Sequence, residues 1–410
     1  MGNKKNILIV GSSAGASAFV KIIKNYDNVG KIYLTGKFFG MGENVEFIDI
    51  RETDVNELLK FAFEHDVNLT VVFSLIALKA DIADVFNANG QVIFAPEYEF
   101  AKYFFDKSLL KKLLYKNGVK IPQFGIFDKQ QKADEYLKTA KLPVIISSLS
   151  PISEKDIYAC PVISLCNIAL NDLFFKGEEK VLIDEYVSGH NFTTYLITDG
   201  VSVLPLGTLS TGKFSDDYEG GFYTTGSWAG IPDNKITKEL EEYIVYDVWE
   251  KISASLNKGQ DSCSGIIGIS GVLKDDEIFI TDINIGINPV DAAVLLNSLD
   301  ENLVSLFEAC AIGSFTDDYD FIKTNDLSYI SLAVFSNTEG KEMPECENID
   351  YISPINSFNN GYLTRKGLFC AVWAEGSTMR RAKQKMAEDI KDLEKIGLKY
   401  RKDVLKNIEL

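Results

Sequence analysis

The sequence is poor in the residues that most often build metal sites and disulfides. It contains two histidines, His65 and His190, which excludes a zinc site made of several histidines. Its six cysteines include no pair with CxxC spacing. In a chain of this size that pattern is typical of reduced thiols in a cytosol, so we expect a cytoplasmic protein.

The sequence also lacks long apolar runs and an excess of positive charge. The apolar run that follows the first lysines covers only residues 7–10, too short for a signal peptide, and no stretch approaches the length of a membrane span. Lys and Arg number 42 against 59 Asp and Glu, a formal net charge of −17. This balance argues against nucleic acid or an anionic membrane as the main partner. Small-molecule substrates, which need only a local positive pocket, are the expected partners.

The composition predicts an ordinary globular protein with more than one core. The 410 residues are 46% hydrophobic and 11% aromatic, enough for two to four domains. Strands expected at 6–10, 31–35, 46–50 and 69–75, with helices between them, predict an open α/β domain over residues 1–100. A lysine-rich amphipathic helix at 100–118 then leads to Ile121-Pro122 and a small α/β unit over 123–190, with strands at 143–148 and 180–189.

The second half of the chain predicts alternating strands and helices. We expect a strand pair over 193–209, a helix at 237–257, a hairpin from 265–273 to 277–285, a helix at 301–312, more strands from 328 and a charged helix at 377–394. Residues 210–232 are rich in glycine, threonine and aromatics with little regular pattern. We interpret them as a long functional or mobile loop that a ligand orders.

Two short stretches suggest binding sites. Strand 6–10 is followed by Gly11-Ser12-Ser13-Ala14-Gly15 and then a helical pattern, an arrangement that can cradle a phosphate. The spacing is GxxxG rather than GxGxxG, so a turn without a ligand is the alternative. In residues 280–285 polar and apolar residues alternate, which places Asp282 and Asn284 on one side of a strand, where they could hold Mg²⁺. Solvated positions on an open sheet face are the alternative there.

Several longer segments, in this order and spacing, resemble phosphoribosylamine–glycine ligases of the ATP-grasp superfamily. They are FAKYFFDKSLLKKLLYKNGVKIP (100–122), VLIDEYVSGHNFTTYLITDGVSVLPL (181–206), the hairpin ending at Asp282-Ile283-Asn284, and LFCAVWAEGSTMRRAKQKMAEDI (368–390). The resemblance implies an N-terminal α/β domain (1–100), a linker helix (101–122), ATP-grasp parts (123–190 and 191–327) that clamp a nucleotide between two sheets, and a C-terminal α+β domain (328–410). It implies a monomer or small homo-oligomer in purine biosynthesis that joins glycine to phosphoribosylamine through an acyl phosphate, with ATP and Mg²⁺.

The resemblance also implies roles for individual residues. Asp282 and Asn284 fall on the family's metal ligands, although the first is Glu in the family. Lys213 is the basic catalytic group of the 210–232 region. The expected nucleotide contacts are Ser147, Asp184, Glu185, Tyr186, Val187 and His190, and the expected substrate contacts are Gly11, Ser12, Ser13, Asp217 and Thr224.

Some ligand-side positions depart from the family pattern. Ser147 stands where the family has a lysine, and residues 148–161, SLSPISEKDIYACP, lack the glycines of the family's flap, with Lys155 as a partial substitute. His190 and Asn191 replace an acidic pair expected to hold ribose. By this count only the metal pair, Glu185 and Lys213 remain, which predicts weak ATP binding. Two functions therefore stay open: an ATP-dependent carbon–nitrogen ligase, or an inactive paralogue that keeps the fold as a binding or assembly module.

Overall fold

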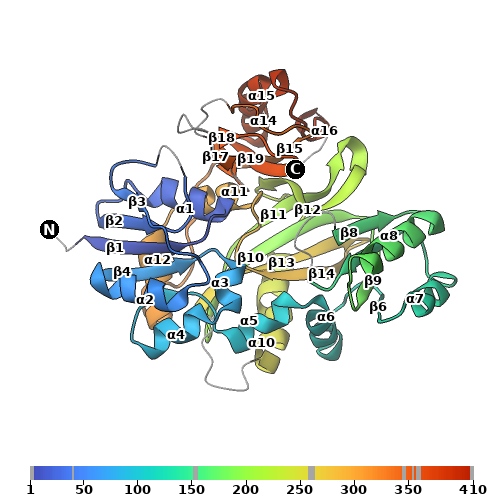
Figure 1. The fold of residues 1–410 in the computed structure, drawn as a ribbon, viewed down its shortest axis with the longest axis horizontal. Coiled ribbons are helices and arrows are strands. Elements are labelled where there is room, and N and C mark those ends of the chain that lie inside the picture. Colours follow the sequence, from blue (N-terminus) through green and yellow to red (C-terminus); the bar gives the residue numbers. More distant parts are fainter. Residues whose placement is uncertain are drawn as a thin grey trace.

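The computed structural model describes residues 4–38, 41–150, 156–256, 264–343, 348–352, 355–356 and 362–406. These residues form four β-sheets with helices packed around them (Figure 1). The mixture of a parallel sheet and antiparallel sheets confirms the expected combination of α/β and α+β architecture.

The N-terminal sheet is parallel and buried on both faces. Its order is β3-β2-β1-β4-β5, and its strands are β1 (Lys5–Val10), β2 (Val29–Leu34), β3 (Val45–Phe47), β4 (Val67–Val72) and β5 (Ile93–Phe94). Its first core cluster includes α2 (Val55–Glu64), α3 (Leu75–Lys79) and α4 (Ile82–Ala88). Its second includes α1 (Ala14–Ile23), α11 (Ala292–Ser298) and α12 (Leu303–Ile312). Burial on both sides explains why the run 7–10 contains only apolar residues.

The linker forms two helices rather than the single helix that its pattern predicts. Helix α5 (Tyr98–Phe105) ends at Asp106, whose φ of −127° and ψ of 108° are not helical. The Asp106 carboxylate accepts a hydrogen bond of 2.7 Å from the backbone N–H of Ser108 and caps α6 (Lys107–Lys116). The single-helix prediction was wrong because amphipathic periodicity continues across a residue that caps a new helix.

A small antiparallel sheet forms the right-hand part of the molecule in Figure 1. Its order is β6-β9-β7-β8, and its strands are β6 (Phe124–Phe127), β7 (Val144–Ser148), β8 (Ile157–Cys160) and β9 (Val181–Glu185). Apolar residues of these strands pack against α7 (Gln130–Leu137) and α8 (Ile163–Phe175). The strands expected at 143–148 and 180–189 are therefore confirmed.

The largest sheet has eight strands, and each neighbouring pair is antiparallel. The order is β14-β13-β10-β11-β12-β15-β19-β16, so strands on both sides of residue 328 share one sheet. The bounds are β10 (His190–Asp199), β11 (Val203–Asp216), β12 (Gly220–Ile231), β13 (Ser264–Lys274), β14 (Glu277–Ile285), β15 (Ser328–Ser336), β16 (Ile349–Tyr351) and β19 (Gly367–Gly376).

The remaining elements cover or extend this sheet. A helical segment runs through α9 (Lys238–Glu242), a π-helical turn (Tyr243–Val248) and α10 (Trp249–Leu256), as the pattern at 237–257 predicts. The other elements are α13 (Phe315–Asp318), α14 (Met379–Asp389), α15 (Lys391–Lys395), α16 (Asp403–Lys406) and the short pair β17 (Ile355–Asn356) and β18 (Tyr362–Leu363).

The segment 210–232 is a long β-hairpin, so the prediction of an irregular loop was wrong. Strand β11 pairs with β12, with Gly212 opposite Trp228. Strand β12 also pairs with β15 on its other side. A Cβ atom at Gly212 would lie 1.9 Å from the indole nitrogen of Trp228. The glycine therefore makes room for a large side chain on the neighbouring strand instead of providing backbone freedom.

Candidate functional site

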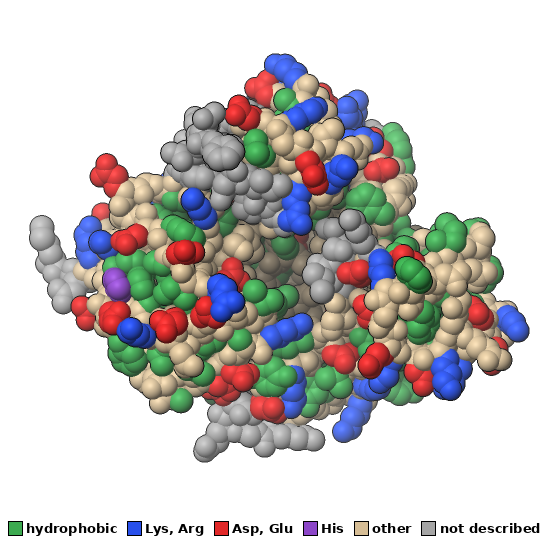
Figure 2. Space-filling view, viewed as in Figure 1, with side chains coloured by type: hydrophobic (Ala, Val, Ile, Leu, Met, Phe, Trp, Pro, Cys, Tyr) green, Lys and Arg blue, Asp and Glu red, His purple; other side chains and the backbone are tan. Residues whose placement is uncertain are grey.

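A cavity of about 100 Å³ lies between the small sheet, the large sheet and the start of α6. The space-filling view shows the molecule hollowed between the N-terminal elements and the small sheet (Figure 2). The cavity gathers nine of the residues singled out from the sequence, although they come from distant parts of the chain. They are Ser147, Asp184, Glu185, Tyr186, Val187, Lys213, Thr224, Asp282 and Asn284.

Strand pairing explains how the two walls of the cavity form. On the small sheet β7 pairs with β9, with Ile145 opposite Asp184. On the large sheet β13 pairs with β14, with Ser270 opposite Asp282 and Gly268 opposite Asn284. The register shifts between Ser270 and Gly271, which leaves Thr281 as a bulge.

The bulge turns Asp282 and Asn284 toward the cavity while Ile280 and Ile283 stay in the core. Both polar residues line the cavity, as the alternation predicts. Among the described residues no group of three His, Cys, Asp or Glu side chains is arranged to hold a metal. A carboxylate and an amide oxygen nevertheless suit Mg²⁺, which usually keeps several waters and takes its other ligands from substrate phosphates.

Two lysines of α6 also reach the cavity, and the sequence analysis did not include them. The Lys107 ammonium lies 3.3 Å from the Asp282 carboxylate. The Lys111 ammonium lies 3.0 Å from the Asp184 carboxylate and donates a 3.0 Å hydrogen bond to the Thr281 carbonyl. Their spacing of four residues places them on one side of a helix, and this is the signal that could have identified them. The sequence analysis counted Lys213 as the only remaining cation at the nucleotide site, and that count was therefore incomplete.

Lys213 lies on β11 and donates a 3.0 Å hydrogen bond to the Thr225 carbonyl across the hairpin. Its side chain is half-buried. Desolvation lowers its pKa, while the negative charges of Asp291 and Asp282 act in the opposite direction. Lys213 is therefore a half-buried cation whose charge is favoured by two acids, Asp282 on β14 and Asp291 in the segment after β14.

Asp291 is a buried acid beside the cavity that the sequence analysis did not assign a role. It is 1% exposed and accepts hydrogen bonds from the Tyr195 hydroxyl at 2.7 Å and the Asn288 amide at 3.4 Å. Burial raises the pKa of Asp291, and Lys213 and the two hydrogen bonds lower it in part. Asp291 thus holds Tyr195 and the cavity-lining Asn288 in place and faces the Lys213 charge.

Five of the predicted site residues lie outside the cavity. His190 contacts Asp233 at 2.7 Å. The Asp217 carboxylate accepts hydrogen bonds from the backbone of Lys402 and Asp403. Gly11, Ser12 and Ser13 form the β1–α1 turn, in which the Gly11 N–H donates to Thr35 and Ser13 caps α1. Their roles stay predictions, and Lys155 lies outside the described residues.

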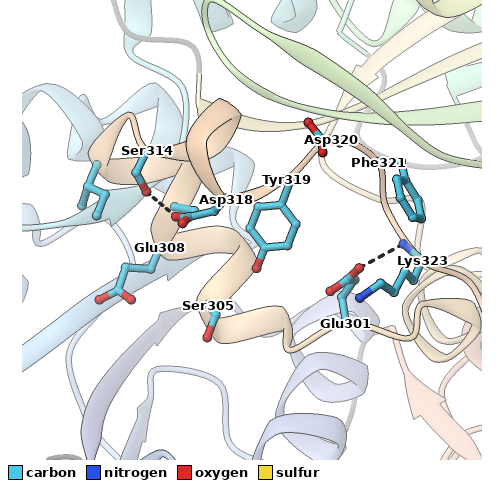
Figure 3. Close-up of a pocket in the computed structure, with 11 residues that line it drawn as sticks. Glu301, Ser305, Glu308, Ser314, Asp318, Tyr319, Asp320, Phe321 and Lys323 are labelled. Atoms are coloured by element: carbon cyan, nitrogen blue, oxygen red, sulfur yellow. Dashed lines mark hydrogen bonds between the residues drawn. The ribbon is translucent and has the colours of Figure 1, made fainter.

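A larger hollow of about 540 Å³ lies beside α12 and α13 (Figure 3). It is lined mainly by acidic and aromatic residues, including Glu301, Asp318 and Tyr319, and by none of the residues singled out from the sequence. Several of its acids already have partners, since Asp318 accepts from Ser314 and Glu301 accepts from the Lys323 backbone. The smaller cavity is therefore the better candidate for function.

Within the part of the chain that the structure describes, no helix combines the length and apolar character needed to cross a membrane.

Comparison with known proteins gives a consistent set of relatives. Residues 5–103 match the family described as phosphoribosylglycinamide synthetase, N domain, and residues 105–288 match its ATP-grasp (A) domain. A phosphoribosylamine–glycine ligase of Clostridium acetobutylicum is 23% identical over 98% of this chain and 99% of its own. A phosphoribosylamine–glycine ligase of Lactococcus lactis is 23% identical over 97% of this chain and 98% of its own.

Solved structures share the fold. A phosphoribosylamine–glycine ligase of Thermotoga maritima superimposes with a TM-score of 0.74 at 16% identity, covering 97% of this chain and 99% of that one. A second neighbour is the biotin carboxylase domain of a Hydrogenobacter thermophilus 2-oxoglutarate carboxylase, solved with magnesium, ADP and bicarbonate. It superimposes with a TM-score of 0.69 at 14% identity, covering 95% of this chain and 90% of that one.

Proposed function

The chain belongs to the phosphoribosylamine–glycine ligase family of ATP-grasp proteins, and we propose that it joins glycine to phosphoribosylamine in purine biosynthesis. ATP and Mg²⁺ are the cofactors of ATP-grasp ligases. The observation that carries the proposal is the gathering of Asp282, Asn284 and three lysines around one cavity.

The charges in this cavity suit the chemistry of the reaction. When bound, ATP with Mg²⁺ supplies an activated phosphoryl group to the glycine carboxylate. Because the anionic carboxylate attacks an anionic phosphoryl group, positive charge around both is needed to offset their repulsion. We assign Asp282 and Asn284 to the metal. We assign Lys107 and Lys213 to the negative charges of the nucleotide and the carboxylate, because each ammonium group borders the cavity close to the metal pair.

We assign the segment Asp184–Val187 to the nucleotide base. The N–H of Glu185 donates to the Gln123 carbonyl at 2.8 Å, and that of Tyr186 donates to the Pro143 carbonyl at 3.1 Å. These two bonds tie the end of β9 to the segments that precede β6 and β7, so the backbone of Val187 is the part of the segment that we expect to contact the base. Tyr186 adds an aromatic wall, packed edge-on against Phe214 at 5.9 Å between ring centroids.

A coupled assay tests the proposal. The purified protein should release ADP only when ATP, a divalent cation, glycine and phosphoribosylamine are all present. Omission of glycine or of phosphoribosylamine serves as the control. Absence of both Mg·ATP binding and ADP release would contradict the proposal and would favour the paralogue that keeps the fold without catalysis.

We also propose the division into an N-terminal domain, a linker, two ATP-grasp parts and a C-terminal domain at the boundaries given above. The sheets support the first parts, since residues 5–94 and 124–185 each contain a sheet of their own. A reducing, cytoplasmic environment is supported by the thiols of Cys160, Cys166 and Cys310, none of which is in a disulfide.

A further inference from the structure

Helix α6 directs two lysines to the cavity, and they face different parts of it. Lys107 contacts Asp282 of the metal pair, whereas Lys111 contacts Asp184 at the segment assigned to the base. The two side chains start just over one helical turn apart, about 6 Å along the helix axis. Their ammonium groups therefore mark a path from the metal pair to the base segment.

Lys111 is buried to a degree that is rare for lysine. It is 2% exposed, and yet it borders the cavity. A lysine ammonium has three N–H donors. One donates to the carbonyl of the bulged residue Thr281, and the Asp184 carboxylate lies 3.0 Å away. This arrangement holds the charge at the cavity wall, and the two partners account for two of the three N–H donors.

We propose that Lys111 is a binding residue for the polyphosphate of the nucleotide and acts together with Lys107. This inference rests on the proposed function. Ser147 lies on the wall of the same cavity and carries no charge. In this chain the positive charge along the nucleotide is therefore supplied by α6 and Lys213, not by β7.

The competing interpretation is that Lys111 only joins three elements, because its contacts connect α6, β9 and β14. A single substitution cannot separate the two, since loss of Lys111 leaves the Asp184 charge without its partner and could destabilise the fold. Removal of both charges avoids that cost. The informative comparison is thus between Asp184→Asn and the double variant Lys111→Met with Asp184→Asn.

The experiment is isothermal titration of Mg·ATP and, separately, of adenosine into each protein. Lys112→Met serves as the matched control, because Lys112 is the adjacent lysine on the exposed side of α6. The double variant should bind Mg·ATP about tenfold more weakly than Asp184→Asn, since a charge-assisted hydrogen bond is lost. Adenosine, which has no phosphate, should bind both variants equally. Lys112→Met should bind Mg·ATP like the unmodified protein.

Addition of Ser147→Lys to the double variant should restore part of the Mg·ATP affinity, because it places a cation in the same cavity. Equal Mg·ATP affinity in Asp184→Asn and the double variant would overturn the role of Lys111, and so would an equal loss of adenosine affinity. If the unmodified protein binds no Mg·ATP, the proposed function fails and this assignment fails with it. If the unmodified protein binds Mg·ATP but Asp184→Asn and the double variant bind it with equal affinity, only the assignment of Lys111 is wrong.

Discussion

Two groups of buried or half-buried cations in this protein differ in how completely carboxylates of the chain neutralise them. Arg401 is 1% exposed and donates to both oxygens of Asp403, at 2.8 and 2.6 Å, and to Glu219 at 2.8 Å. Among the residues that the structure describes, the α6 lysines of the cavity have fewer partners: Lys107 has one carboxylate at 3.3 Å, and Lys111 has one carboxylate and one carbonyl.

The difference indicates what each group is for. The Arg401 cluster connects the tip of the β11–β12 hairpin to the start of α16, and Asp217 reinforces it by accepting from the backbone of Lys402 and Asp403. A cation such as Arg401, which donates to two carboxylates of the protein, joins parts of the fold. A cation at a cavity wall with few partners keeps its capacity for a ligand.

The largest effect is expected from loss of Arg401. Arg401→Met should lower the free energy of unfolding by about 3–5 kcal/mol, because the buried Asp403 carboxylate loses its partner. Urea denaturation measures this loss. Arg365→Met, at an exposed arginine, is the control and should change stability little. An Arg401 variant as stable as the unmodified protein would remove the distinction between the two groups.

A second prediction concerns the hairpin itself. Gly212→Ala places a methyl group against the Trp228 indole and should cost about 1–3 kcal/mol of stability through overpacking. In the unmodified protein the paired amides of β11 and β12 should exchange slowly without any ligand, because they belong to the large sheet. Fast exchange that slows only with ligand would support a ligand-ordered loop instead.

The metal pair supplies the third prediction. Asp282→Asn removes a negative ligand and should weaken Mg·ATP binding at least about tenfold, or roughly 1.4 kcal/mol. Isothermal titration measures the change. Asp276→Asn, in the exposed turn of the same hairpin, is the matched control. If both variants bind like the unmodified protein, the metal assignment is wrong.

The smallest effect concerns pH. Burial raises the pKa of Asp403, but the hydrogen bond and charge of Arg401, together with hydrogen bonds from the Tyr218 backbone and with Asp217, lower the net pKa. A carboxyl with a lowered folded pKa stabilises the protein above its unfolded value, about 3.9, and that contribution is lost as the pH falls through the folded pKa. The acid-side loss of stability should therefore be smaller in Asp403→Asn than in the unmodified protein. An identical pH dependence in urea denaturation would contradict this.

Local pattern was enough to predict most elements and one wall of the site. The alternation around Asp282 and Asn284, the hairpin 265–285 and the strands of both α/β regions follow from side-chain periodicity, because one face of each must be buried. The motif order was enough to identify the family and to single out the segment Asp184–Val187, which lines the cavity and whose contact with a nucleotide stays a prediction.

Only the tertiary structure decided which charged residues meet. Lys107 and Lys111 have the periodicity of a surface helix, and their contacts depend on the packing of α6 against β14 of the large sheet and β9 of the small sheet. Residues 210–232 were taken for a loop because the sequence does not reveal that Trp228 covers Gly212 on the neighbouring strand. Arg401 donates a hydrogen bond to Glu219, which lies 182 residues away in the sequence. The periodicity of apolar side chains predicts which face of one element is buried. The partner of a charged side chain depends on how different elements pack against each other.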